Sequence, residues 1–188
     1  MHWNGITLIA LIAFTALLFL LDLAVGSVSI PLGEVWSALS GGRVSDEAWR
    51  SIVREVRLPE AITALVAGGA LAASGLLMQT LFRNPLAGPS VLGITSGSGL
   101  GVAVVMLAAP VWSSFLPAEA AITLAAFGGA VVLLLLILLA DRRIGDGITL
   151  LIVGMMAGYL CSALVSVLQV ASAASALKGY VMWGMGSF

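Results

Sequence analysis

Five apolar stretches, each about 20 residues long, constrain this chain more than any other feature of its sequence. A helix needs about 20 consecutive apolar residues to cross the hydrocarbon core of a bilayer. Backbone groups in lipid have to bond internally, and nothing here suggests the alternating strands of a barrel. We therefore expect an all-α, polytopic transmembrane helix bundle with about five spans and short surface helices. The stretches are residues 6–25, 61–81, 91–109, 121–140 and 148–171.

The composition supports a membrane protein and excludes several other classes. The chain of 188 residues is 61% hydrophobic and 9% charged, whereas soluble domains carry about 25% charged residues. Eight Lys and Arg oppose nine Asp and Glu, so the chain has no basic field for nucleic acid. The single Cys161 cannot form an internal disulfide, and with the single His2 it cannot hold zinc. We predict no metal site, no cofactor and no nucleic-acid partner.

The usual catalytic patterns are also missing. The one lysine, Lys178, is not part of a Gly-Lys-Ser/Thr signature, so no phosphate-binding loop is expected. A nucleophile at Ser96 or Ser98 would need a base, and His2 precedes the first span. The carboxylates near the membrane lie at span ends, where solvated or capping roles are expected. We predict no catalytic residue and no enzymatic activity, so ATP used in transport would be hydrolysed by another polypeptide.

The long connection between the first two stretches, residues 27–60, has the pattern of a folded segment. Pro31 can open a short helix that runs through Leu39. Ser45-Asp46-Glu47 is typical of a second helix start and is followed by apolar residues at helical spacing. We expect two short helices here, followed by a membrane span that Pro59 opens.

Three arginines share one face of the second short helix, at positions 50, 54 and 57. One interpretation is a solvated stripe with Glu47 and Glu55 as partners. The other is a docking ridge, because exposed guanidinium groups suit the carboxylates of an acidic partner.

Small residues dominate the second and third stretches and predict close helix packing. Three of them form a GxxxGxxxG ladder, which allows the backbone of a neighbouring helix to approach closely. A subunit interface or a channel is the alternative to packing within the chain. The glycines that we assign to packing are Gly68, Gly75, Gly93, Gly97 and Gly101. Between these stretches, Asn84-Pro85 predicts a tight turn, and Ser90 is expected to cap the helix that follows.

Several motifs follow one another in an order that is specific when they are taken together. They are Arg57-Leu58-Pro59, the run 68–75 with Gln79, Arg83-Asn84-Pro85-Leu86-Ala87, the run 92–97, and Met182-Trp183-Gly184-Met185-Gly186-Ser187. In this order they resemble the FecCD-type permeases, the membrane subunits of ABC importers for ferric siderophores, haem and cobalamin. The resemblance covers essentially the whole chain. It implies about twice as many spans as the chain holds, so residues 1–188 are expected to be an incomplete single permease domain, roughly its first half.

The resemblance implies roles for particular residues. A cytoplasmic gate is implied at Asn84, Pro85, Leu86, Gly147 and Ile148. The fifth span would face the dimer axis, with Met155, Met156 and Tyr159 lining the pathway. Arg54 and Arg57 would lie near the site where a substrate-binding protein docks.

The resemblance also implies partners and a location. The partners are a second permease copy in a homodimer, two ATP-binding subunits, a periplasmic or lipoprotein substrate-binding protein and the lipid bilayer. The location is the inner (plasma) membrane, with a cytoplasmic N-terminus and the loop 27–60 outside. The helix that couples to the ATPase is expected to lie beyond this part of the sequence.

Two observations leave alternatives open. The count of basic residues on the two sides favours the opposite orientation, because more of them lie in the loops assigned to the outside. The alternative function is a fragment of a secondary, ion-coupled transporter that uses Asp22 or another membrane carboxylate. A membrane enzyme would need catalytic residues from a partner chain.

Overall fold

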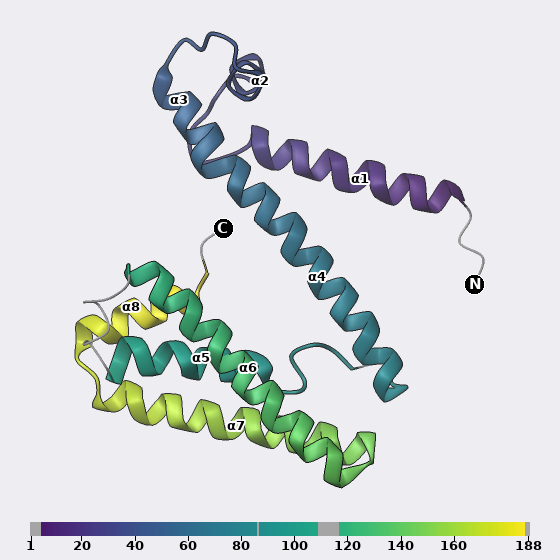
Figure 1. Ribbon diagram of the computed structural model, residues 1–188. Helices are drawn as coiled ribbons and strands as arrows, with labels where there is room; N and C mark the ends of the chain where they lie inside the picture. The colour runs from purple at the N-terminus through teal and green to yellow at the C-terminus, as the bar shows by residue number, and fades with distance from the viewer. Residues whose placement is uncertain (1–4, 86, 109–116, 187–188) are drawn as a thin grey trace. The chain divides into compact units, whose positions relative to one another are not determined.

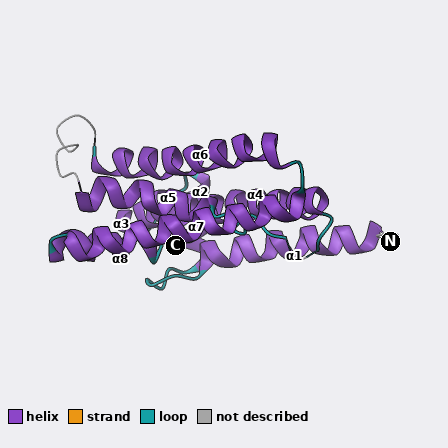
Figure 2. Cartoon of the chain, turned by 90° about the horizontal axis from the view of Figure 1, so that it is seen from below, coloured by secondary structure: helices purple, strands orange, loops and turns teal. Residues whose placement is uncertain are grey.

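The computed structural model describes residues 5–85, 87–108 and 117–186, and throughout these ranges it contains helices joined by loops (Figure 1, Figure 2). The predicted all-α architecture is therefore confirmed. Contacts within the chain separate two units, one ending at Ala70 and the other beginning at Leu71. The two units are described separately below, and the assignment of 1–188 as one permease domain stays a prediction.

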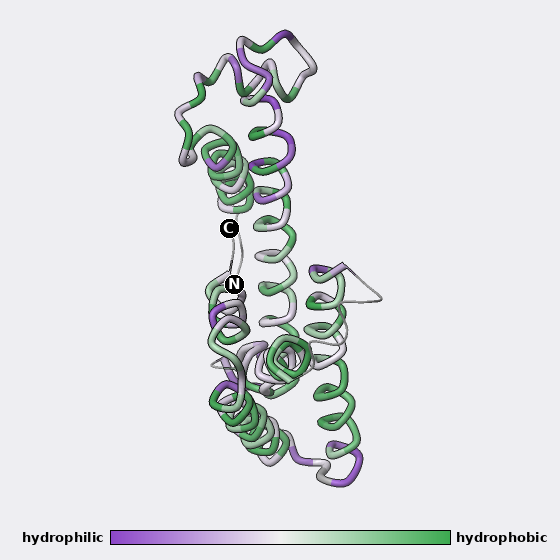
Figure 3. Tube along the Cα trace, turned by 90° about the vertical axis from the view of Figure 1, so that its left-hand side faces the viewer, coloured by the Kyte–Doolittle hydropathy of each residue, from purple (hydrophilic) through white to green (hydrophobic). Residues whose placement is uncertain are grey.

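Four helices of the described part are long and apolar enough to cross a membrane, and hydrophilic residues concentrate in the connections between helices (Figure 3). These segments are Gly5–Ala24, Glu47–Phe82, Ala118–Arg143 and Gly147–Ala171. The predicted third span is described as the helix Ile94–Ala108, which begins three residues after the predicted start at Val91. Ala109, its predicted end, lies outside the described residues.

In the first unit, α1 (Gly5–Ala24) is followed by the short helix α2 (Leu32–Ser40). Pro31 occupies the N-cap position of α2, and the left-handed Gly41 ends the helix with φ 82°. The next helix, α3 (Glu47–Ser51), begins after Asp46, whose side chain accepts a 2.9 Å hydrogen bond from the Ala48 amide. Both helices thus start at the residues from which the sequence predicts them.

Pro59 does not open a new helix, and this prediction is wrong. The chain stays helical from α3 through the π-helical turn η1 (Ile52–Arg57) into α4 (Leu58–Phe82). Proline inside a helix lacks the amide that would bond to an earlier carbonyl. The π-turn lies immediately before Pro59, and there the Leu58 amide bonds to Val53 O, five residues back. A π-bulge shifts the hydrogen-bond register, which lets the helix pass through the proline.

The segment of residues 25–60, called the loop region below, has a small core of its own. Its buried members are Ile30, Val35, Ala38 and Val53. Glu34, in the first turn of α2, connects this helix to the start of α3 by accepting hydrogen bonds from the amide, at 3.0 Å, and the hydroxyl of Ser45. These bonds, the hydroxyl bond first, lower the pKa of the Glu34 carboxyl. The loop region is therefore held by a few apolar contacts together with polar bonds.

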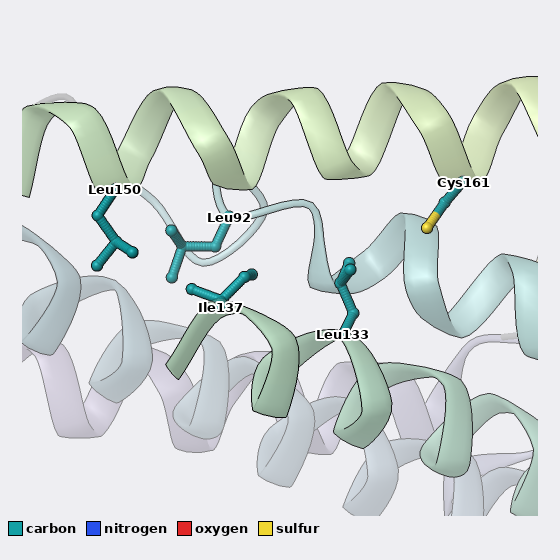
Figure 4. Close-up of a cluster of buried hydrophobic side chains, with 5 residues drawn as sticks. All are labelled: Leu92, Leu133, Ile137, Leu150 and Cys161. Atoms are coloured by element: carbon teal, nitrogen blue, oxygen red, sulfur yellow. The ribbon is translucent and has the colours of Figure 1, made fainter. Parts of the chain in front are cut away.

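In the second unit, α5 (Ile94–Ala103) packs against α6 (Ala118–Ile144) and α7 (Gly147–Ala171). The π-turn η2 (Val104–Ala108) continues α5, and α8 (Ala174–Gly184) packs against η2. Apolar side chains from these helices and from the segment before α5 meet in one cluster (Figure 4). The cluster contains Leu92, Leu133, Ile137, Leu150 and Cys161.

Helix α8 is one of the short helices that follow or separate the apolar stretches, and it runs from Ala174 to Gly184. Its Tyr180 hydroxyl donates a 3.3 Å hydrogen bond to Gly99 O of α5. A Cβ on Gly99 would lie 3.4 Å from the hydroxyl oxygen, at the close end of ordinary contact, so this hydrogen bond does not by itself require a glycine.

Candidate functional site

The turn that follows α4 is ordered by several hydrogen bonds. The Asn84 amide donates to Gln79 O at 3.2 Å, and the Arg83 amide donates to Thr80 O at 3.4 Å. This pattern is a Schellman motif, which places Arg83 in the left-handed position at φ 46°. The left-handed conformation costs a residue with a side chain about 1–2 kcal/mol of conformational free energy. The Gln79 side-chain amide also donates to Pro85 O at 3.1 Å, which holds the turn against the end of α4.

The rest of the turn leads into α5 through further backbone bonds, from Ala87 to Asn84 O, from Val91 to Gly88 O and from Gly93 to Ser90 O, at 3.0–3.1 Å. The prediction that Ser90 caps α5 is wrong, because Gly93 occupies the N-cap position with φ 71° and forms no side-chain cap. Only glycine fits there, since a Cβ would lie 2.7 Å from Gly154 O and from the Cα of Gly158. The helix start is therefore determined by contact with α7.

The second predicted gate segment is the turn between α6 and α7. Gly145 adopts φ 64°, and Asp146 caps α7 by accepting bonds from the Thr149 amide (2.9 Å) and hydroxyl (2.6 Å). The Thr149 hydroxyl and, after it, the amide lower the pKa of the Asp146 carboxyl. A Cβ on the next residue, Gly147, would lie 3.5 Å from Cδ1 of Phe82. The start of α7 therefore lies against the end of α4.

The structure thus brings the two predicted gate segments together through Phe82, which the sequence analysis missed. The available signal was a large aromatic residue directly before Arg83. Asn84, Pro85 and Ile148 are exposed in this chain, and Leu86 lies outside the described residues. A gate role for these residues stays a prediction.

Helix α7 has two different faces. Its buried positions are Leu150, Gly154, Gly158 and Cys161, which face α5, α6 and the turn before α5. The pathway residues predicted by the resemblance lie elsewhere: Met156 and Tyr159 are 65% and 74% exposed, and Met155 is half-buried. Apolar side chains continue this open face in both directions, at Ile148, Ile152, Val167 and Val170.

The glycine ladder of α5 meets small residues of α6. A Cβ on Gly101 would lie 2.1 Å from Ala125 O, and a Cβ on Gly129 would lie 2.2 Å from Gly97 O. Real Cβ atoms are not found at such distances, so the two backbones are in direct contact at these points. The sequence analysis identified Gly97 and Gly101 and missed their partner Gly129, although the Gly128-Gly129 pair was a visible signal.

The two glycines predicted on α4 have fewer neighbours. A Cβ on Gly68 would meet none of the described atoms within 4 Å, and one on Gly75 would meet only Cδ of Pro89, at 3.9 Å. Their packing role stays a prediction.

Arg57 joins the end of α1 to the start of the long helix. Its guanidinium donates to Leu23 O and Ala24 O, both at 3.1 Å, and to Val28 O. The side chain is 6% exposed, and a Cβ on Gly26 would lie 2.8 Å from its Nη2 atom. A cation at the last carbonyls of a helix is favourable, because these carbonyls have no partner within the helix. The burial of Arg57 argues against a direct docking contact through this side chain.

The other two arginines of the stripe bond to carbonyls in the same way. Arg54 donates to Ala38 O at 2.6 Å and to Leu39 O at 3.2 Å, at the end of α2. Arg50 donates to Gly42 O at 2.8 Å and lies 3.1 Å from the Glu47 carboxylate. Docking through the exposed Arg54 stays a prediction, whereas the carbonyl bonds, which the sequence analysis did not foresee, hold the loop region together.

The fold is that of a polytopic helical membrane protein in which glycines allow direct backbone contact and an ordered turn precedes the third apolar helix. Residues 14–188 match the family described as the FecCD transport family. The chain belongs to this family.

Among its relatives is the "vitamin B12 import system permease protein BtuC" of Serratia proteamaculans (strain 568), 36% identical over 174 residues. That alignment covers 92% of this chain and 50% of the relative. The BtuC protein of Klebsiella pneumoniae subsp. pneumoniae is 35% identical over 185 residues, which cover 98% of this chain and 50% of the relative. The chain therefore spans about half the length of the curated relatives it matches.

A solved structure gives the same picture of the fold. It is described as an inward-facing conformation of an ABC transporter of metal-chelate type. It is 29% identical to this chain with a TM-score of 0.78, and the match covers 98% of this chain and 54% of that one.

Proposed function

We propose that this chain is the N-terminal part of the membrane-spanning permease subunit of an ABC importer for iron chelates (siderophore or haem) or cobalamin. The observation that carries the proposal is the family match over residues 14–188. Relatives named as vitamin B12 permeases and a neighbour of metal-chelate type support the substrate class. Two copies of the permease form the pathway, separate ATP-binding subunits supply the energy, and a substrate-binding protein delivers the cargo.

In this proposal the chain carries substrate without reacting with it. The open face of α7, with Met156 and Tyr159, lines the pathway together with Met155. The turn at Asn84, Pro85 and Leu86 narrows its cytoplasmic end. The contact between Phe82 and Gly147 supports this assignment, since it keeps the α6–α7 turn against the end of α4. Movement of α4 or α7 would then change the width of the pathway at its cytoplasmic end, as alternating access requires.

The proposed location is the inner membrane, with the N-terminus in the cytoplasm and the loop region outside. The arginines of the loop region count against this orientation when charges alone are compared. Their bonds to carbonyls and to Glu47 place them in a folded segment, where they stabilise structure. A maleimide that cannot cross the membrane tests the orientation: Asn84→Cys should react only from the cytoplasmic side and Arg43→Cys only from the outside. The reverse pattern would contradict it.

Uptake by cells that carry the complete reading frame tests the transport function. Radiolabelled cobalamin, a ferric siderophore and haem are offered separately to a deletion strain and to the complemented strain. We expect uptake of one of them to fail when ATP is depleted while the membrane potential is maintained. Uptake that follows a proton or sodium gradient and is insensitive to ATP would favour the secondary transporter with Asp22 and contradict the proposal.

A further inference from the structure

The short helix α2 has one face that the described structure leaves uncovered. Its inner face carries Val35 and Ala38, which are buried against Val53. Beside this face Leu32 and Trp36, four residues apart, are each 70% exposed. The helix contains one charged residue, Glu34, and that carboxylate is bonded to Ser45. The exposed pair Leu32 and Trp36 is therefore apolar, and the uncovered part of α2 has no free charge.

The contacts of Arg57 determine the height of α2 relative to the end of α1. Arg57 binds the carbonyls of Leu23 and Ala24, where the membrane helix α1 ends. Val53, against which α2 packs, precedes Arg57 by four residues. Both residues lie in the π-turn η1, and four residues of even an α-helix rise by only about 6 Å. Since the headgroup layer on each side of a bilayer is about 5–8 Å thick, α2 lies at the depth of the lipid headgroups whenever α1 crosses the membrane.

We propose that α2 is an interfacial helix that binds the lipid surface through Leu32 and Trp36. Trp is enriched at membrane–water interfaces because its indole has an apolar body and a polar N–H group. Amphipathic helices bind this zone by burying their apolar face at the headgroup–acyl boundary. The segment that links α1 to α2 also carries exposed apolar side chains, at Val25 (70% exposed) and Val28 (39% exposed). An acidic protein partner would instead need free basic groups on this face, and α2 has none.

Spin labels at single cysteines test the proposal in the full chain, reconstituted in vesicles of phosphatidylethanolamine and phosphatidylglycerol. The native thiol is removed by Cys161→Ala. Labels are placed by Trp36→Cys and Leu32→Cys, with Leu18→Cys on exposed α1 as the lipid control and Arg43→Cys as the water control. Collision rates with oxygen, which concentrates in lipid, and with a water-soluble nickel complex are then compared.

We expect oxygen collisions to exceed nickel collisions at Trp36 and Leu32, as at Leu18, with the opposite order at Arg43. Nickel collisions in excess at both positions would place this face in water and overturn the proposal. Low rates with both reagents would mean that a second copy or another protein covers α2, which also overturns it. The proposal rests on the membrane placement of α1 and not on any cargo, so the Leu18 label separates failure of α2 from failure of that placement.

Discussion

The loop region and the α5–α6 contact are held together by opposite means. In the loop region, long arginine side chains reach across to carbonyls at the ends of α1 and α2. Between α5 and α6, glycines bring the two backbones into direct contact without any side chain between them. A guanidinium can shift to accommodate a change, whereas a backbone atom cannot move without its helix. Substitutions should therefore be tolerated less well in the glycine contact than in the loop region.

The largest effect is expected from Gly129→Ala. The added Cβ would lie 2.2 Å from Gly97 O, so α5 and α6 would have to separate. We expect a loss of about 3 kcal/mol, at the upper end for overpacked sites, measured by thermal unfolding in detergent. The adjacent Gly128→Ala is the matched control, because a Cβ there meets none of the described atoms within 4 Å. It should leave stability unchanged or raise it, and equal losses from both variants would contradict the packing argument.

The next effect should come from Arg57→Met, which removes the guanidinium from three carbonyls. Hydrogen bonds to charged groups contribute about 1.5–3 kcal/mol each in favourable cases, and partial replacement by water reduces the total. We expect a loss of about 2–3 kcal/mol in the same unfolding assay. Arg57→Lys should recover only part of it, because a single ammonium cannot reproduce the forked geometry.

Arg43→Met serves as the control for Arg57→Met, since Arg43 is exposed in the same loop region. Its effect should stay within about 0.5 kcal/mol. If both variants lose the same amount of stability, the hydrogen bonds from Arg57 to carbonyls do not stabilise the loop region.

A smaller effect is expected from Gly26→Ala, which directly compares the two kinds of contact. Its Cβ would lie 2.8 Å from Nη2 of Arg57, the flexible end of a side chain rather than a backbone atom. The cost should be about 1 kcal/mol, well below that of Gly129→Ala. In the Arg57→Met background most of this cost should disappear, because the clash is with the group that was removed. Additive losses in a double-mutant cycle would show that Gly26 acts independently of Arg57.

The smallest effect concerns pH and applies to both regions. Hydrogen bonds lower the pKa of Glu34 in the loop region and of Asp146 before α7, below the ordinary values of 4.5 and 3.8. The stability that the two ionised carboxylates add to the folded state is complete above the ordinary pKa values. It is lost as the pH falls through the lowered pKa of the folded state. Glu34→Gln and Asp146→Asn should each make the decline of the melting temperature below pH 5 less steep. An unchanged decline in both would contradict these roles.

Local signals in the sequence predicted much of the fold. Four of the five apolar stretches correspond to described helices long enough to cross a membrane, and Pro31 and Asp46 marked helix starts that the structure also has. The prediction that Pro59 opens a new helix was wrong because of the π-turn before it. A π-turn is a change of hydrogen-bond register, and no residue type indicates such a change in the sequence. Gly93 replaced Ser90 as the cap because of Gly154 and Gly158, about 60 residues further along the chain.

The sequence predicted less of the candidate site than of the fold. The resemblance identified the two gate segments but not Phe82, because the contact with Gly147 depends on how two distant helices meet. The arginine stripe was visible as a pattern, yet a pattern on one helix does not reveal which carbonyls lie opposite it. Long-range partners of this kind are set by tertiary packing, which periodicity and spacing do not encode.

The glycine contacts of the third apolar helix have a consequence for how the protein is made. Gly97 and Gly101 meet the backbone of α6, and Gly93, directly before α5, meets the backbone of α7. Both α6 and α7 follow α5 in the chain, so they leave the ribosome after it. The packing positions on α5 therefore stay without their partners until the two later helices have been made, and this part of the fold cannot assemble one helix at a time in chain order.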